Sequence, residues 1–329
     1  MMGVIQERLC ALRALMKEQG MDAYLVPTAD FHESEYVGEH FKCREYITGF
    51  TGSAGTAVVT MDEACLWVDG RYFVQASHEL EGTSVTMMKM GREGVPDVEE
   101  YLEQTLPSKG CLGFDGRVVN AAAGLNLEDV LEDKNVRISY GLDLIGSIWD
   151  HRPELSAKPA WVLAQQYAGK CSEDKIQDVR EAMKKAHASV HVLTSMDDIA
   201  WLLNIRGGDI RHNPVVLSYV VVTMEQLYLF VNEEVLEHRA YPYMDNGEDI
   251  TTRQYLEDIG VTVLPYDQLY DMVEGFRNEK VLLEKSRVNY AIYRLLDSSN
   301  KIIDRMNPTA LMKSVKNDVC LLYTSDAAD

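Results

Sequence analysis

Apolar positions near the start of the chain first follow the spacing of a helix and then form the short runs that are typical of strands. The first set recurs at the spacing of one helical face: Ile5, Leu9, Leu12 and Met16. This pattern predicts an amphipathic helix, and Gly20 is well placed to end it. The apolar run 23–26 then predicts a strand, and the stretch 54–68, interrupted by a turn at 61–63, predicts a β-hairpin.

A break in the pattern divides the chain into two parts. From Trp149 to Pro159, two prolines and no regular periodicity predict a linker. A second amphipathic helix begins near Ser172. Its apolar face consists of Ile176, Val179, Met183, Ala186 and Val190.

The two parts share one pattern of elements. Leu12–Lys17 resembles Val179–Lys184, and each segment leads into an apolar strand and then an acidic turn. Further on, Val58–Asp62 and Val221–Glu225 end a strand of the predicted hairpins in the same way. An offset of about 165 residues indicates duplicated domains rather than a solenoid. We therefore predict an α/β fold with two related domains, each a mixed β-sheet flanked by helices.

The charge of the chain restricts its partners. It has 32 lysines and arginines against 52 acidic residues, a net charge of −20 at pH 7. Such a field repels phosphate backbones and anionic membrane surfaces, so we expect neither nucleic acid nor membrane as a partner. The 6 cysteines form no C-x-x-C pair and are typical of free thiols in a reducing cytoplasm.

Common catalytic and nucleotide-binding motifs do not fit the sequence. The glycine-rich segment Gly49–Gly55 lacks the lysine and the following helix that a phosphate loop needs, so we interpret it as a tight turn between strands. The nucleophile motif G-x-S-x-G does not occur. His187 and His191 are four apart, like metal ligands on a helix, but His191 falls where a strand should begin and a third ligand is needed.

Two loops carry the side chains with the most functional character. Asp69–Tyr72 follows a strand, and its arginine and tyrosine could contact a ligand or, as we favour, fix a strand-to-helix corner by hydrogen bonds. Arg206–Pro214 places charge, glycines and His212 between a helix and a strand, and loops of this kind often hold sites. Asp197 and Asp198 are interpreted as the start of a helix.

Several segments, taken in order, resemble one known family. They are Tyr46–Thr56, Leu66–Phe73, Met88–Gly91, Ile148–Glu154, Asp198–Gly207 and His212–Val215. The ordered set resembles the N-terminal half of the three-domain Xaa-Pro aminopeptidases (aminopeptidase P) of the creatinase/prolidase superfamily. The resemblance covers residues 4–318 and implies two tandem creatinase-type N-terminal domains, which we place at 1–155 and 156–318.

The resemblance implies a metallopeptidase, a hydrolase that cleaves the bond between an N-terminal residue and a following proline. Its substrates would be short proline-containing peptides. In the family, a third domain of pita-bread fold holds two divalent metal ions, usually manganese, through two aspartates, a histidine and two glutamates. The pair activates water and polarises the peptide carbonyl. We expect the full-length protein to be a cytoplasmic homo-oligomer.

That third domain is not expected in this chain, so we assign it no catalytic residue, metal ligand or cofactor and expect it to be inactive alone. In the superfamily, the N-terminal domains line the active-site cleft, sometimes that of a neighbouring subunit. By position, Asp209, His212 and Asn213 are candidates for the substrate side of the cleft rim, followed by Asp69 and Arg71.

We expect the chain to be cut just before the catalytic domain. Ala310–Asn317 resembles the segment that leads into that domain, and the match stops after Asp318. The tail 319–329 resembles translated adaptor sequence instead, so we expect it to be an artefact. Poor packing is therefore expected for Leu321, Leu322 and Tyr323.

Two other functions stay open. The chain could be a free-standing, catalytically silent binding or oligomerisation module, which a genuine stop near residue 329 would support. It could also be an independent metal enzyme built on His187 and His191, which divalent metal bound to the purified chain would support.

Overall fold

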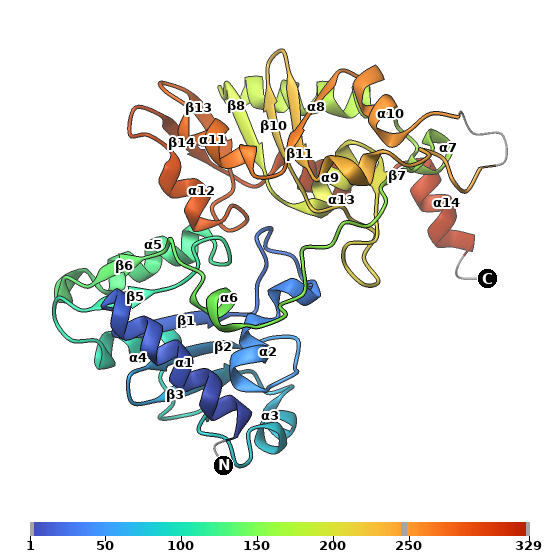
Figure 1. The fold of residues 1–329 in the computed structure, drawn as a ribbon. Coiled ribbons are helices and arrows are strands. Elements are labelled where there is room, and N and C mark those ends of the chain that lie inside the picture. Colours follow the sequence, from blue (N-terminus) through green and yellow to red (C-terminus); the bar gives the residue numbers. More distant parts are fainter. Residues whose placement is uncertain (1–2, 245–248, 327–329) are drawn as a thin grey trace. The chain divides into compact units, whose positions relative to one another are not determined.

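The computed structural model describes residues 3–244 and 249–326. Their contacts divide the chain into two compact units, which we treat separately (Figure 1). Unit 1 comprises Met1–Phe31, Val37–Leu155 and Asn289–Ala291, and unit 2 comprises His32–Tyr36, Ser156–Val288 and Ile292–Asp329. Two short segments, 32–36 and 289–291, therefore pack with a different unit from that of their neighbours in the sequence.

The described part of unit 1 forms a six-stranded mixed sheet in the order β4-β3-β2-β1-β5-β6 (Figure 1). The strands are β1 (Ala23–Pro27), β2 (Thr56–Thr60), β3 (Ala64–Val68), β4 (Thr86–Lys89), β5 (Cys111–Gly113) and β6 (Arg137–Ser139). β2 pairs antiparallel with both β1 and β3, and the β2–β3 pair is the predicted hairpin. The outer pairs β3–β4, β1–β5 and β5–β6 are parallel. The β2–β3 pair needs only the turn at 61–63, whereas β1 and β2 are joined by the long segment 28–55 and the parallel pairs β3–β4 and β5–β6 by crossovers that contain a helix.

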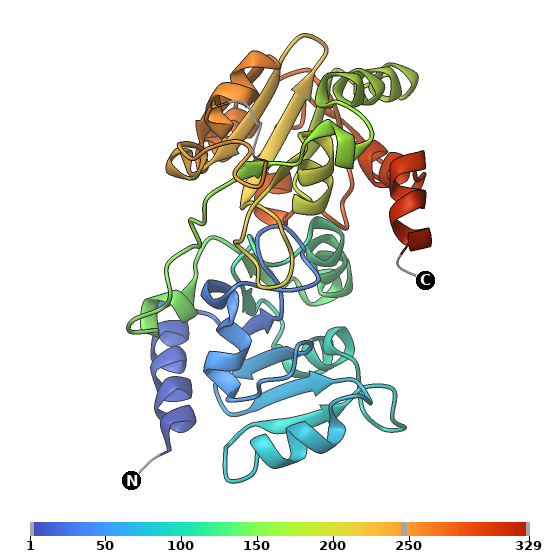
Figure 2. The same ribbon diagram turned by 90° about the vertical axis from the view of Figure 1, so that its right-hand side faces the viewer.

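Helices cover both faces of this sheet (Figure 2). They are α1 (Val4–Gln19), α2 (Cys43–Thr48), α3 (Phe73–Glu79), α4 (Val98–Thr105), α5 (Ala121–Val130) and α6 (Leu144–Ile148), with 3-10 turns η1 (Glu39–Phe41) and η2 (Glu132–Lys134). Alternate residues of β1 reach opposite cores: Tyr24 packs with α1, and Leu25 packs with α4 and α5. Because both faces are covered, β1 and β3 are apolar at every position, whereas the edge strands β4 and β6 carry the exposed Lys89 and Arg137.

The first predicted helix is confirmed as α1. Its apolar face buries Leu9, Leu12 and Met16 in the core of unit 1. Gly20 ends the helix in the left-handed conformation, with φ 63°, and its N–H bonds to the carbonyl of Lys17. Glycine adopts this backbone conformation without the steric cost that a side chain brings.

Unit 2 repeats the same sheet. The order of its described strands is β12-β11-β10-β8-β13-β14, again with an antiparallel centre and parallel outer pairs. The strands are β8 (Val190–Leu193), β10 (Ser218–Thr223), β11 (Leu227–Val231), β12 (Val261–Pro265), β13 (Lys280–Leu283) and β14 (Lys301–Asp304), beside a two-stranded ribbon of β7 (Trp161–Val162) and β9 (Ile205–Arg206). The same order and the same strand directions confirm the predicted duplication.

The helices of unit 2 include the second predicted amphipathic helix, α8 (Ser172–Lys185). It buries Ile176, Val179 and Met183, but it ends at Lys185, so Val190, which was predicted on the same helical face, begins β8 instead. The others are α7 (Gln165–Ala168), α9 (Met196–Leu202), α10 (Thr252–Asp258), α11 (Gln268–Glu274), α12 (Tyr290–Leu295), α13 (Pro308–Ser314) and α14 (Asp318–Asp326), with the 3-10 turn η3 (Glu233–Leu236). α12 begins with two residues of unit 1. In the described ranges, no helix has the length and apolar character needed to cross a membrane.

The end of the chain forms α14. Leu321 and Leu322 are 52% and 64% exposed, which agrees with the poor packing expected for them. The Tyr323 side chain lies outside the described part. The foreign origin of 319–329 stays a prediction.

Candidate functional site

Asp209 lies in the loop that joins β9 to β10 in unit 2, and the residue as a whole is 8% exposed. Oδ1 accepts the backbone N–H of Lys158 at 3.0 Å, and Oδ2 accepts that of Leu217 at 2.8 Å. A buried carboxylate with two backbone donors holds the loop in one conformation. Asp209 therefore positions its neighbours in unit 2 and does not extend its carboxylate into solvent.

His212 and Asn213 form the turn that Asp209 anchors. Asn213 N–H bonds to the carbonyl of Ile210 at 3.2 Å, and Val215 N–H bonds to the carbonyl of Asn213 at 2.9 Å. His212, which directly precedes Asn213, has a φ of 64°, in the left-handed region where histidine and asparagine are enriched. Its side chain is exposed and Asn213 is half-buried.

Two alanine substitutions separate these roles. Asp209→Ala should lower the free energy of unfolding of unit 2 by about 2 kcal/mol, because the N–H groups of Lys158 and Leu217 lose their acceptor. His212→Ala should change it by less than about 0.5 kcal/mol, because the side chain is exposed. Urea titrations followed by tryptophan fluorescence measure both, and equal losses would contradict this division of roles.

Asp69 and Arg71 lie in unit 1, directly after β3. Asp69 Oδ1 accepts the backbone N–H of Arg71 at 2.9 Å, and the two carboxylate oxygens accept Nε and Nη2 of the guanidinium at 3.0 and 2.8 Å. The hydrogen bonds from Arg71 lower the pKa of the Asp69 carboxyl. The pair thus fixes the corner before α3, which confirms the structural interpretation, and Arg71 remains exposed.

The sequence contains a second Asp-Gly-Arg tripeptide at 115–117, whose turn was not predicted although it repeats the one at 69–71. Asp115 follows β5, accepts the Arg117 backbone N–H at 2.9 Å and binds its guanidinium at 2.9–3.3 Å. The Arg117 guanidinium also lies 4.5 Å from the centre of the Phe31 ring, within unit 1. In both places the Asp-Gly-Arg tripeptide fixes the turn that follows a strand of the sheet.

The histidine pair does not form a ligand set. His187 lies just after α8, with φ 58°, whereas His191 is a buried residue of β8. His191 Nδ1 is 3.0 Å from the Leu282 carbonyl, and burial lowers the pKa of its imidazole. Within 3–244 and 249–326, no group of three or more His, Cys, Asp or Glu is arranged to hold a metal ion. The metal-enzyme alternative therefore has no third ligand in this part of the chain.

Comparison with protein families decides where the chain belongs. Models of the creatinase/prolidase N-terminal domain match residues 8–143 and 151–319, so that each match falls largely in one unit. The chain belongs to the creatinase/prolidase N-terminal domain family. The predicted fold class is thereby confirmed, because two such domains occur in tandem and each contains a mixed sheet with helices on it.

Relatives of this creatinase/prolidase family chain include Xaa-Pro aminopeptidases. "Xaa-Pro aminopeptidase 1" of Dictyostelium discoideum is 34% identical over 95% of the chain and 49% of its own length, and "Aminopeptidase P2" of Arabidopsis thaliana is 35% identical over 98% and 45%. A crystal structure of X-prolyl aminopeptidase from Caenorhabditis elegans, described as a cytosolic enzyme with a di-nuclear active site, is similar with a TM-score of 0.86 and 30% identity. The match covers 96% of this chain and 52% of that one. The chain thus spans about half the length of the relatives it matches.

Proposed function

We propose that the chain forms the two N-terminal domains of an Xaa-Pro aminopeptidase, and that the longer protein hydrolyses the bond between an N-terminal residue and a following proline in short peptides. The observation that carries the proposal is the similarity of 96% of the chain to the C. elegans X-prolyl aminopeptidase, with a TM-score of 0.86. The description of that enzyme as cytosolic supports a cytoplasmic location. A homo-oligomer, as the family resemblance implies, is part of the same proposal.

A dinuclear metal centre does not fit the described residues of this chain. A catalytic pair of ions needs several shared carboxylate or imidazole ligands, and residues 3–244 and 249–326 bring no three such groups together. We therefore place the divalent ions of the proposed enzyme, with manganese as the expected metal, in another part of the longer protein. No catalytic step is assigned to residues of this chain.

The role of the chain in this proposal is to support the catalytic part and to supply side chains to the rim of its cleft. His212 and Arg71 are the proposed rim contacts, because their side chains are exposed. Asp209 and Asp69 hold the two turns in place, and Asn213 lies in the same turn as His212. An unchanged KM of the longer enzyme after His212→Ala would remove that residue from the rim.

The deciding experiment compares the 329-residue chain with the product of the longer reading frame that its locus should encode. The longer protein, supplied with Mn²⁺, should hydrolyse Xaa-Pro peptides and lose that activity when a chelator is added, because a bound metal pair generates the nucleophile. The 329-residue chain should show no hydrolysis under the same conditions. Hydrolysis by this chain alone, or a transcript that ends at residue 329, would contradict the proposal and favour a binding module in the second case.

A further inference from the structure

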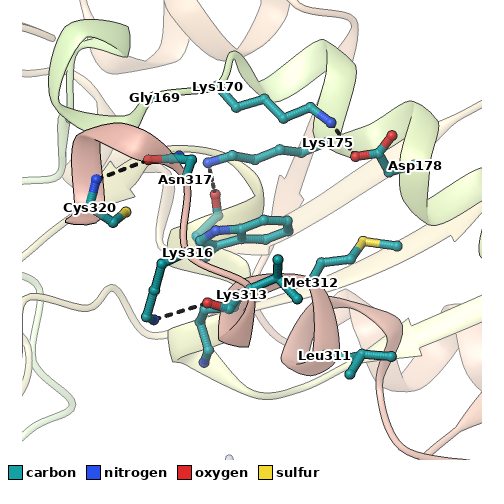
Figure 3. A pocket seen from close by; sticks show the side chains of 12 residues that line it. Gly169, Lys170, Lys175, Asp178, Leu311, Met312, Lys313, Lys316, Asn317 and Cys320 are labelled. Carbon is teal, nitrogen blue, oxygen red and sulfur yellow. Dashed lines mark hydrogen bonds and ion pairs between the residues drawn. The ribbon is translucent and has the colours of Figure 1, made fainter. Parts of the chain in front are cut away.

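The helix α13 in unit 2 turns its polar side inward and an apolar side outward. Thr309 is fully buried and Lys313 is half-buried, whereas Leu311 and Val315 are 63% and 74% exposed. A step of two residues turns a helix by about 200°, so Leu311 and Val315 lie opposite Thr309 and Lys313. Figure 3 shows Leu311 and Met312 leaving α13 in different directions, and Met312 is the one that packs against the core of unit 2. A surface helix normally buries its apolar side, so the orientation of α13 needs another cause.

An ion pair with α9 holds the polar side of α13. Lys313 Nζ lies 2.8 Å from Asp198 Oδ1, and the Asp198 side chain is only 3% exposed. The ammonium lies outside the hydrogen-bond angles of this oxygen, so the contact is an ion pair without a directed hydrogen bond. The start of α9 favours a carboxylate, but the exposed Asp197 serves that purpose without the cost of burial. Because a buried carboxylate needs a cation, Asp198 fixes Lys313 and with it the rotation of α13 about its own axis.

Two more polar contacts hold the chain on either side of α13. Before the helix, the Asn307 N–H donates to Glu284 Oε2 at 2.8 Å. After the helix, Asn317 Nδ2 donates to the Ala168 carbonyl at 3.0 Å. All of these partners belong to unit 2. The segment 307–317 is therefore fixed at three points, and the outward direction of its apolar side is defined by polar contacts rather than left to chance.

The position and size of the apolar side indicate what covers it. The family match 151–319 ends a few residues after Val315, and it is a match to an N-terminal domain in a chain that spans about half the length of its relatives. The further polypeptide of such a longer protein begins close to this helix. A tethered segment has a high effective concentration, so a contact with two aliphatic side chains is sufficient to seat it. A separate partner or a second copy needs a much larger surface.

We propose that Leu311 and Val315 form a docking surface for the polypeptide that follows residue 319 in the longer protein, and that the Asp198–Lys313 pair keeps this surface turned outward. The inference rests on the proposed function in one respect, the existence of that longer protein. Docking removes the two aliphatic side chains from water, which favours one fixed arrangement of the following polypeptide on unit 2.

The test measures how fast N-ethylmaleimide alkylates the thiol of Leu311→Cys in the 329-residue chain and in the longer protein. Peptide mass spectrometry separates this site from the natural cysteines. The rate should fall at least about tenfold in the longer protein, because a covered thiol reacts only after local opening. Val74→Cys is the matched control, since Val74 on α3 is 72% exposed and its rate should be the same in both proteins. Hydrogen exchange of α13 without any substitution is the second measurement, and it should slow in the longer protein.

Variants of Lys313 test the role of the ion pair. In the longer protein with Leu311→Cys, Lys313→Met should raise the alkylation rate at least about threefold, whereas Lys313→Arg keeps a cation beside Asp198 and should not. An unchanged rate in Lys313→Met would overturn this role.

Two results would overturn the docking surface itself. One is an equal alkylation rate of Leu311→Cys in both proteins. The other is a slow rate in the 329-residue chain that recovers on dilution, which would assign the surface to a second copy. Protection of the thiol in a longer protein that hydrolyses no Xaa-Pro peptide would support the surface and contradict the proposed function alone.

Discussion

Arg44→Leu should lower the free energy of unfolding of unit 1 by about 3–5 kcal/mol, the range found when a buried charged network loses one partner. Arg44 lies in α2 and is 4% exposed. Its guanidinium donates to Thr28 Oγ1 at 3.0 Å and to the carbonyls of Phe50 and Gly52. Leucine would leave those acceptors buried without a donor. Urea unfolding and hydrogen exchange of residues 49–60 measure the loss.

The same residue explains why the glycine-rich segment 49–55 is ordered. Thr28 Oγ1, which accepts from Arg44, itself donates to the Gly55 carbonyl at 2.8 Å. The Arg44 guanidinium also lies 4.8 Å from the centre of the buried Phe50 ring. One planar side chain therefore holds the turn; the structural role predicted for this segment is present, but the turn joins the helix α2 to β2 and not two strands. Burial lowers the pKa of Arg44 to about 10, so it stays charged at neutral pH.

Two variants control the Arg44 prediction. Arg44→Lys should recover less than half of the lost stability, because an ammonium cannot reproduce the fork of a guanidinium that reaches three acceptors. Arg137→Gln, at an exposed arginine of β6, should change stability by less than about 0.5 kcal/mol. A loss below about 1 kcal/mol in Arg44→Leu would show that water replaces the guanidinium in this turn.

Local patterns in the sequence were sufficient to predict much of the fold. The helical spacing of Leu9, Leu12 and Met16 and the hairpin at 54–68 depend on neighbours in the chain, and both are present. The duplicated pattern predicted two related domains, and the two sheets share one strand order. Such signals depend on apolar periodicity, which burial on a sheet or helix face imposes directly.

Polar side chains were harder to predict, because their partners are mostly backbone groups. Arg44 and Lys175 are buried and bond to carbonyls, although the composition of protein interiors places such residues at the surface. A carbonyl acceptor has no residue-type signature, so the sequence does not reveal it. Asp209 was predicted at a cleft rim, but its carboxylate binds two backbone N–H groups in unit 2. The rim role stays a prediction for all five candidates: Asp209, His212, Asn213, Asp69 and Arg71.

Tyr290→Ala should destabilise unit 1 by about 3–5 kcal/mol, the usual cost of truncating a large buried aromatic residue. Tyr290 is fully buried, its N–H bonds to the Val119 carbonyl at 2.7 Å, and its hydroxyl bonds to Glu128. Its ring packs edge-on against Phe114 and Tyr140, with centroids 5.6 and 5.0 Å apart. Hydrogen exchange of β5 and α5 measures the loss, because these elements surround the ring within unit 1.

The sequence position of Tyr290 and its contacts in the fold point to different units. Residue 290 falls in the family match 151–319, yet it packs with unit 1, so protection should fall in 111–130 and persist in β10 and β11 of unit 2. Gly124→Ala tests the same contact from the other side. A methyl group there would lie 2.1 Å from a carbon of the Tyr290 ring, a clash that outweighs the gain of about 1 kcal/mol in helix propensity. Tyr290→Phe keeps the ring and should cost only about 1 kcal/mol. Loss of protection in β10 and β11 instead would place the stabilising contacts of Tyr290 in unit 2.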